Sequence, residues 1–246
     1  MRVFSANLVS NLLKYNMPCG SRRHRCNRAA AGTAAVCALV AVLAGAATTA
    51  RSQDTALEEA AHRRAALAHL PEDAAKRVFG LATSPAHGPA QAIGPYTTGG
   101  LAGAVALPAD GPNWQVMRPS RNRAWGHPAL IAFLENLAVA AARDAQWPGF
   151  LVGDIAQPRG GPMLTGHASH QIGIEADIWL TPMPDRRLSP AERDEMPASN
   201  LVATSGDDID PEIWRPQHRQ LLEAAARRPG VARIFVNPAI KRALCR

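Results

Sequence analysis

The sequence of 246 residues is poor in cysteine and in aromatic residues. Three of its four cysteines fall within the first 50 residues, which leaves Cys245 alone in the remainder. A fold held together by several disulfides is therefore excluded for residues 51–246. Aromatic residues make up only 5% of the sequence, whereas hydrophobic residues make up 47%. Together with 20 Pro and 19 Gly, this composition is typical of a loop-rich globular protein of one or two domains.

Acidic residues are missing altogether from residues 1–50, which contain six Lys and Arg. The formal net charge of +7 arises in this segment, because the other 21 basic residues are balanced by 20 acidic ones. A net charge of only +1 over residues 51–246 does not provide the basic surface that a polyanion requires. We therefore expect no nucleic acid as a partner.

The basic segment at the N-terminus is followed by an apolar one. Four arginines between residues 22 and 28 precede a run of small apolar residues from Ala29 to Ala47. Segments resembling Ala-x-Ala cleavage sites follow, and the whole pattern is typical of a secretory signal. A run of almost twenty residues is also long enough for a transmembrane anchor. Its Ala-rich, weakly hydrophobic composition favours the signal peptide, so we predict that residues 1–50 are removed and that no stable membrane anchor remains. Translation starts at Met1 or Met17.

The rest of the sequence predicts an α+β protein. Residues 51–82 are rich in Ala, Glu and Arg and predict one or two polar helices, interrupted near Pro71. From residue 83 onward, helical and strand patterns mix without a regular βαβ period, so we expect an α+β domain over residues 83–246, with a small antiparallel sheet and flanking helices. Helices are predicted over Pro128–Arg143 and Trp214–Arg227, and strands over residues 150–155, 172–180 and 233–236.

Two histidines and an aspartate stand close together in the sequence. His167 and His170 lie in the loop before the strand predicted for residues 172–180, and Asp177 lies on that strand. Gly173 allows a sharp bend between the loop and the strand. Imidazole and carboxylate groups are the ligands found in catalytic zinc sites. Spacing alone, however, leaves open that these are ordinary polar residues.

A longer motif around these residues resembles a known family. The segment from Gly166 to Ile178 resembles the zinc motif of the D-Ala-D-Ala metallopeptidase superfamily, in the form found in the penicillin-insensitive murein endopeptidases. Three further segments resemble the same family and follow one another in the family's order. These segments are Ile93–Tyr96, Leu107–Pro128 and Ile234–Lys241. The resemblance extends over roughly residues 90–245.

The resemblance implies a metallopeptidase-like fold and a periplasmic zinc endopeptidase. Such an enzyme cleaves the cross-links between D-alanine and meso-diaminopimelate in peptidoglycan. His170 and Asp177 resemble two ligands of the catalytic zinc, and His167 resembles a further metal ligand. Arg121 and Arg123 lie where the superfamily keeps an arginine near the substrate, although either could instead form a structural salt bridge.

The sequence also departs from the family pattern. The family continues beyond the position matched by Cys245 with an H-x-x-H-x-H block, whereas this sequence ends at Arg246. That block supplies a third zinc ligand and the expected general base, so we assign no catalytic base here. Ser205 and Asp208 stand where the family can place an Asp and a His, which disfavours a second metal site. A non-catalytic cell-wall-binding protein or an inactive fragment therefore stays open as an alternative.

The signal-peptide assignment leads to a first prediction. The mature protein, isolated from the periplasm of a producing Gram-negative cell, should begin within a few residues of residue 50, because a signal peptidase cleaves after small residues. N-terminal sequencing measures this directly. A mature chain that retains Met1 or Met17 would instead support the membrane anchor.

Overall fold

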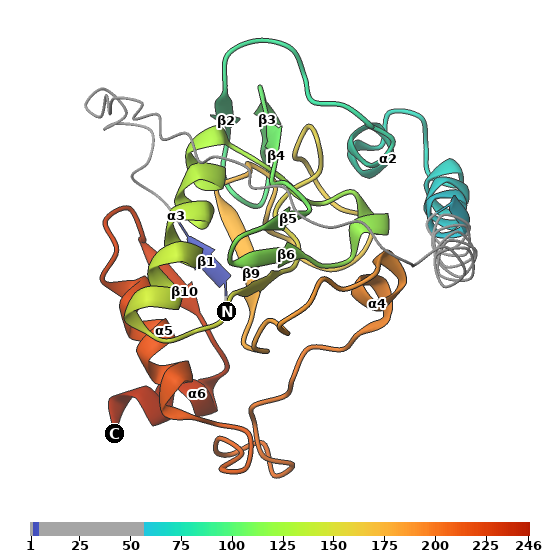
Figure 1. Cartoon of the computed structure of the whole chain (residues 1–246). Coiled ribbons are helices and arrows are strands. Elements are labelled where there is room, and N and C mark those ends of the chain that lie inside the picture. The colour runs from blue at the N-terminus through green and yellow to red at the C-terminus, as the bar shows by residue number, and fades with distance from the viewer. Residues whose placement is uncertain (1, 5–56) are drawn as a thin grey trace, which may run out of the picture.

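A computed structural model describes residues 2–4 and 57–246. The central element is a six-stranded sheet (Figure 1). Its strands are β1 (Arg2–Phe4), β5 (Asp110–Gly111), β6 (Trp114–Val116), β8 (Phe150–Val152), β9 (Glu175–Trp179) and β10 (Arg233–Phe235), in the order β10-β1-β9-β8-β6-β5. Neighbouring strands are antiparallel except β6 and β8, which are parallel. The expected α+β fold is confirmed, with one parallel pair within the otherwise antiparallel sheet.

Two small antiparallel ribbons and six helical segments surround the sheet. The ribbons pair β2 (Gln91–Ile93) with β3 (Gly100–Ala102), and β4 (Val105–Ala106) with β7 (Trp125–Gly126). The helices are residues 57–68, α2 (Ala75–Gly80), α3 (Pro128–Asp144), α4 (Pro190–Glu195), α5 (Pro216–Ala226) and α6 (Pro238–Cys245). A short 3₁₀ turn, η1, covers Pro119–Arg121.

The last four helices all begin with proline, whose fixed φ suits the first helical position. The helices predicted to start near Pro128 and Trp214 are confirmed as α3 and α5. Helix α6 was not predicted, although Asn237 before Pro238 is a good start signal and its side chain accepts a hydrogen bond from Ala239 N at 2.9 Å.

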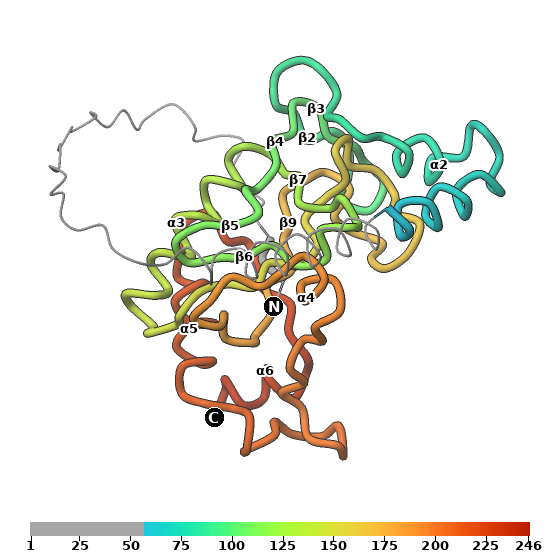
Figure 2. The backbone as a smooth tube through the Cα atoms, turned by 45° about the vertical axis from the view of Figure 1, so that its right-hand side comes forward, coloured from blue at the N-terminus to red at the C-terminus, as the bar shows by residue number. Residues whose placement is uncertain are grey.

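One face of the sheet is covered by α3, α5 and α6. Helices α3 and α5 lie side by side on this face in both views (Figure 1, Figure 2). The buried side chains at this interface come from the three helices and from β6, β8 and β9, and include Leu130, Leu134, Leu137, Val116, Phe150, Val152, Ala176, Ile178, Leu221, Leu222 and Ile240. This apolar layer supplies most of the hydrophobic stabilisation of the domain.

The opposite face of the sheet carries a smaller cluster. Leu151 packs there with Met117 and Leu188, and Trp179 lies partly buried against them. Since side chains alternate along a strand, Asp177 of β9 points to the same face as Trp179, while Ala176 and Ile178 point into the main core. The strand predicted over residues 172–180 is confirmed as β9 over Glu175–Trp179.

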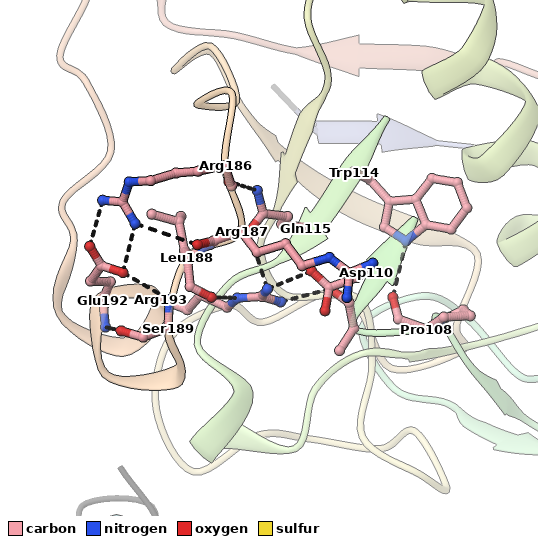
Figure 3. A network of polar contacts seen from close by, with 11 residues as sticks. Pro108, Asp110, Trp114, Gln115, Arg186, Arg187, Leu188, Ser189, Glu192 and Arg193 are labelled. Carbon is pink, nitrogen blue, oxygen red and sulfur yellow. Dashed lines mark hydrogen bonds and ion pairs between the residues drawn. The ribbon is translucent and has the colours of Figure 1, made fainter. Parts of the chain in front are cut away.

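A buried arginine holds the segment around α4 against the edge of the sheet (Figure 3). The guanidinium of Arg193 donates hydrogen bonds to Asp110 Oδ1 at 2.5 Å, to Gln115 Oε1 at 3.1 Å and to two backbone carbonyls. Gln115 in turn accepts from Leu188 N at 2.7 Å and donates to Arg186 O at 2.9 Å. The edge strand β5 is thereby covered, which protects it from pairing with another chain.

The N-terminal helices pack against the same domain. The break predicted near Pro71 is confirmed, because residues 57–68 and α2 are separate helices. Leu67 is fully buried and lies against Gly80, and Arg63 donates a hydrogen bond to Ser120 O at 2.7 Å. Most of the predicted signal peptide lies outside the described residues. Its residues 2–4 form β1 between β9 and β10, so a chain cleaved as predicted would lack this strand. No helix in the described part of the chain is long and apolar enough to span a membrane.

The buried histidine of α5 generates a second prediction. His218 is 3% exposed, its Nδ1 accepts a hydrogen bond from Arg215 N at 2.9 Å, and its Nε2 lies 3.1 Å from Leu180 O. Burial lowers the pKa of His218 from its ordinary 6.5. The contribution of neutral His218 to stability is therefore present above pH 6.5 and is lost as the pH falls through the lowered pKa.

The melting temperature of the wild-type chain should thus fall by several degrees more between pH 7 and pH 5 than that of the His218→Gln variant. Each kcal/mol lost from the free energy of unfolding lowers the melting temperature by about 2–4 °C in a protein of this size. Thermal melts followed by circular dichroism provide the measurement. Equal decreases in the two proteins would show that His218 is not responsible for the acid sensitivity.

Candidate metal site

Three side chains from the loop before β9 and from β9 itself converge. His167 Nε2 lies 2.9 Å from Asp177 Oδ2, and His170 Nε2 lies 3.3 Å from Asp177 Oδ1. One ligand atom from each residue lies within 4.8 Å of the others. Among the described residues, this is the only such group of His, Cys, Asp and Glu side chains. The structure therefore brings together the three residues that the motif analysis identified.

The backbone of the loop is shaped for this convergence. His170 adopts a left-handed conformation with φ of 69°, which is uncommon for a residue with a Cβ and typical of functional sites. Gly173 follows with φ of 67°, and a Cβ there would lie 2.3 Å from Leu101 Cδ2. The bend expected at Gly173 is confirmed, and only glycine fits it.

The donor set fits a metal ion. His170 is fully buried, and neither of its ring nitrogens has a hydrogen-bond partner among the described residues. A buried polar atom without a partner is costly, and a bound cation would satisfy the nitrogen that faces Asp177. Asp177 and His167 are partly open, with side-chain exposures of 21% and 35%, so the site is accessible from one side. Two imidazoles and a carboxylate with one open side therefore suit a metal ion that keeps a position for a further ligand.

The two candidate substrate arginines lie in different surroundings. Arg123 forms the buried salt bridge that the sequence left open, since its Nη1 lies 2.8 Å from Asp154 Oδ2 and the two side chains are 6% and 4% exposed. Arg121 lies 3.5 Å from the same carboxylate oxygen but is 40% exposed. Arg121 is therefore the one of the pair with a guanidinium surface that a ligand can reach.

A groove of about 570 Å³ opens beside the three residues. His167 and Asp177 lie at its wall, together with the end of β9, the segment after β10 and residues 198–202. Trp179 and Asn200 add an apolar surface and an amide to this lining. Residues 198–202 were missed by the sequence analysis, because a long Pro- and Asp-rich insertion has no periodicity that would place it near the motif.

The other two histidines of residues 92–246, His127 and His218, stand at the starts of α3 and α5. His127 Nδ1 accepts from Ala129 N at 3.2 Å at the start of α3, and burial lowers the pKa of His127. Together with His218 it therefore serves helix starts and not the metal cluster. Glu175 is fully buried on β9, and Cys245 is exposed at the end of α6.

The comparisons with known proteins agree with the motif. A family model described as penicillin-insensitive murein endopeptidase matches residues 92–246. A protein of that name from Haemophilus influenzae is 47% identical over 158 residues, which is 64% of this chain and 54% of that protein. Relatives from Yersinia enterocolitica and Klebsiella pneumoniae are 43% and 42% identical over 163 residues, which is 66% of this chain and 58% and 59% of theirs.

The chain spans somewhat more than half the length of these curated relatives. The matched region contains the whole cluster of His167, His170 and Asp177, as well as five of the six strands of the sheet that carries it, since β1 lies outside residues 92–246. Because the family model covers well over half of the chain, this protein belongs to the family of penicillin-insensitive murein endopeptidases.

Proposed function

We propose that the chain carries the zinc site of a periplasmic endopeptidase that hydrolyses the D-alanyl to meso-diaminopimelate cross-links of peptidoglycan. The observation that carries this proposal is the convergence of His167, His170 and Asp177 at the wall of an open groove. The names of the relatives support murein as the substrate class. A zinc ion held by these residues would polarise the scissile carbonyl and activate a bound water.

The protein's own residues orient the ligands. The carboxylate of Asp177 contacts both imidazoles through different oxygens, and one ligand atom of each of the three groups lies within 4.8 Å of the others. His170 is held by complete burial, and Asp177 is held by β9. A rigid set of ligands costs little reorganisation when a substrate binds.

The groove and Arg121 offer a place for the substrate. A substrate peptide would lie in the open groove of about 570 Å³ beside the candidate ligands. The guanidinium of Arg121 lies 3.5 Å from Asp154 Oδ2, is 40% exposed and suits a substrate carboxylate. Arg123 cannot act in the same way while it is buried against Asp154.

A second function is a cell-wall-binding protein without catalysis. Among the described residues that line the groove, Asp177 is the only carboxylate and His167 the only histidine, and both are in the metal cluster. No separate general base is therefore assigned. This observation favours the alternative, and an activity measurement distinguishes the two functions.

The site predicts zinc binding by the purified chain. Zinc should bind with one ion per chain and be removed by a chelator, because the three donors are competent ligands. His170→Ala and Asp177→Ala should each weaken binding by at least about 100-fold, since each removes a direct ligand. The measurement is isothermal titration with Zn²⁺, and the exposed His87 provides the matched control in His87→Ala. Unchanged affinity in His170→Ala would contradict the assignment of the site.

The proposed reaction is tested with cross-linked muropeptide dimers. In the presence of zinc the 246-residue chain should release monomers, and His170→Ala should reduce the rate by at least about 100-fold, because the ion would be lost. Liquid chromatography with mass spectrometry identifies the bond that is cleaved. Binding of the dimers without cleavage would support the non-catalytic alternative, whereas cleavage that persists in His170→Ala would place the reaction elsewhere.

A further inference from the structure

The buried pair of Arg123 and Asp154 lies between the two parts of the chain that supply the metal ligands. Asp154 follows β8, and its backbone is joined to β9. Asp177 N donates to Asp154 O at 2.9 Å, and Gly153 N donates to Asp177 O at 2.8 Å. The strand ligand Asp177 is therefore fixed directly against the backbone of residues 153–154.

Arg123 extends this connection to the loop ligand. Its Nη1 donates to Asp154 Oδ2 at 2.8 Å, while its Nη2 donates to Thr165 O at 3.0 Å and to Thr165 Oγ1 at 3.3 Å. Thr165 stands two residues before His167. A Cβ on Gly166, the residue between them, would lie 3.4 Å from Arg123 Nη1, so the guanidinium lies close along this part of the loop.

The position of Arg123 is itself fixed. Ile155 N donates to Arg123 O at 2.7 Å, so the backbone of Arg123 is bonded next to the residue that its side chain contacts. Both side chains are almost fully buried, at 6% and 4% exposure. A buried ion pair generally gives no more stability than an apolar pair would, and its distinctive property is the fixed direction of its hydrogen bonds.

We propose that Arg123 is a positioning residue, which braces the loop before His167 against Asp154 and so sets the distance between His167 and Asp177. Thr165 is the point of attachment, and Asp154 is the common anchor of the loop and the strand. His170 does not need this brace, because it is completely buried. His167 is 35% exposed and depends on it. The consequence for metal binding rests on the proposed function, whereas the brace itself does not.

The test compares Arg123→Lys with Arg193→Lys in the full chain. Lysine at position 123 keeps a charge for Asp154 but lacks the second arm that reaches Thr165. Arg193 is an equally buried arginine with an aspartate partner, on the segment that covers the edge of the sheet. It therefore controls for the general cost of changing a buried guanidinium.

Two measurements are made on each protein. In the metal-free chain, hydrogen exchange of the amides of residues 164–168 should become at least about 10-fold faster in Arg123→Lys and not in Arg193→Lys, because only the first change releases the loop. Zinc affinity should fall by about 10–100-fold in Arg123→Lys, as is usual when a residue that orients a ligand is changed. It should stay within about twofold of wild type in Arg193→Lys.

A double-mutant cycle shows whether Arg123 acts through His167. In a His167→Ala background, Arg123→Lys should cause no further loss of zinc affinity, because the ligand that it positions is already absent. A full further loss would overturn the proposal, and so would unchanged exchange of residues 164–168 in Arg123→Lys. Failure of the wild-type chain to bind zinc would instead contradict the proposed function. The exchange measurement would then test by itself whether Arg123 braces the loop before His167.

Discussion

The pairing of β8 with β9 is the interaction on which the site depends. It buries Ala176 and Ile178 against α3 and α5, and the two-residue period of the strand then directs Asp177 to the opposite face. A slip of one residue would bury the carboxylate in the apolar core and expose two apolar side chains. The free energy of the core therefore fixes the position of a candidate metal ligand that contributes nothing to the core itself.

The loop before β9 satisfies a different requirement. A strand can present one ligand on a given face every two residues, but His167 and His170 have to approach Asp177 from outside the strand. The left-handed conformations of His170 and Gly173 turn the chain back toward β9 within a few residues. A left-handed backbone conformation is unfavourable in isolation and persists only where the surrounding structure holds it. Here the complete burial of His170 holds the loop in this conformation.

Two buried arginines have similar roles, one at the β5 edge of the sheet and the other beyond the end of β8. Arg193 joins the segment around α4 to β5 and β6, while Arg123 joins the loop of His167 to the end of β8. In both cases a planar group with several donors reaches backbone carbonyls and an aspartate at once, which an apolar side chain cannot do. The irregular segments of this loop-rich protein thus acquire defined positions without regular secondary structure.

The sequence by itself determined the fold class, helix α3, the strand of Asp177 and the three candidate ligands, because periodicity and motif spacing are local properties. It left open whether Arg121 and Arg123 bind substrate or form salt bridges, and it did not find α6 or the part of the groove formed by residues 198–202. Those features depend on which distant segments meet. Arg123 is buried between Asp154 and Thr165, whereas the side chain of Arg121, two residues earlier, is 40% exposed. Only the packing of the whole chain removes one of two neighbouring guanidinium groups from water and leaves the other accessible.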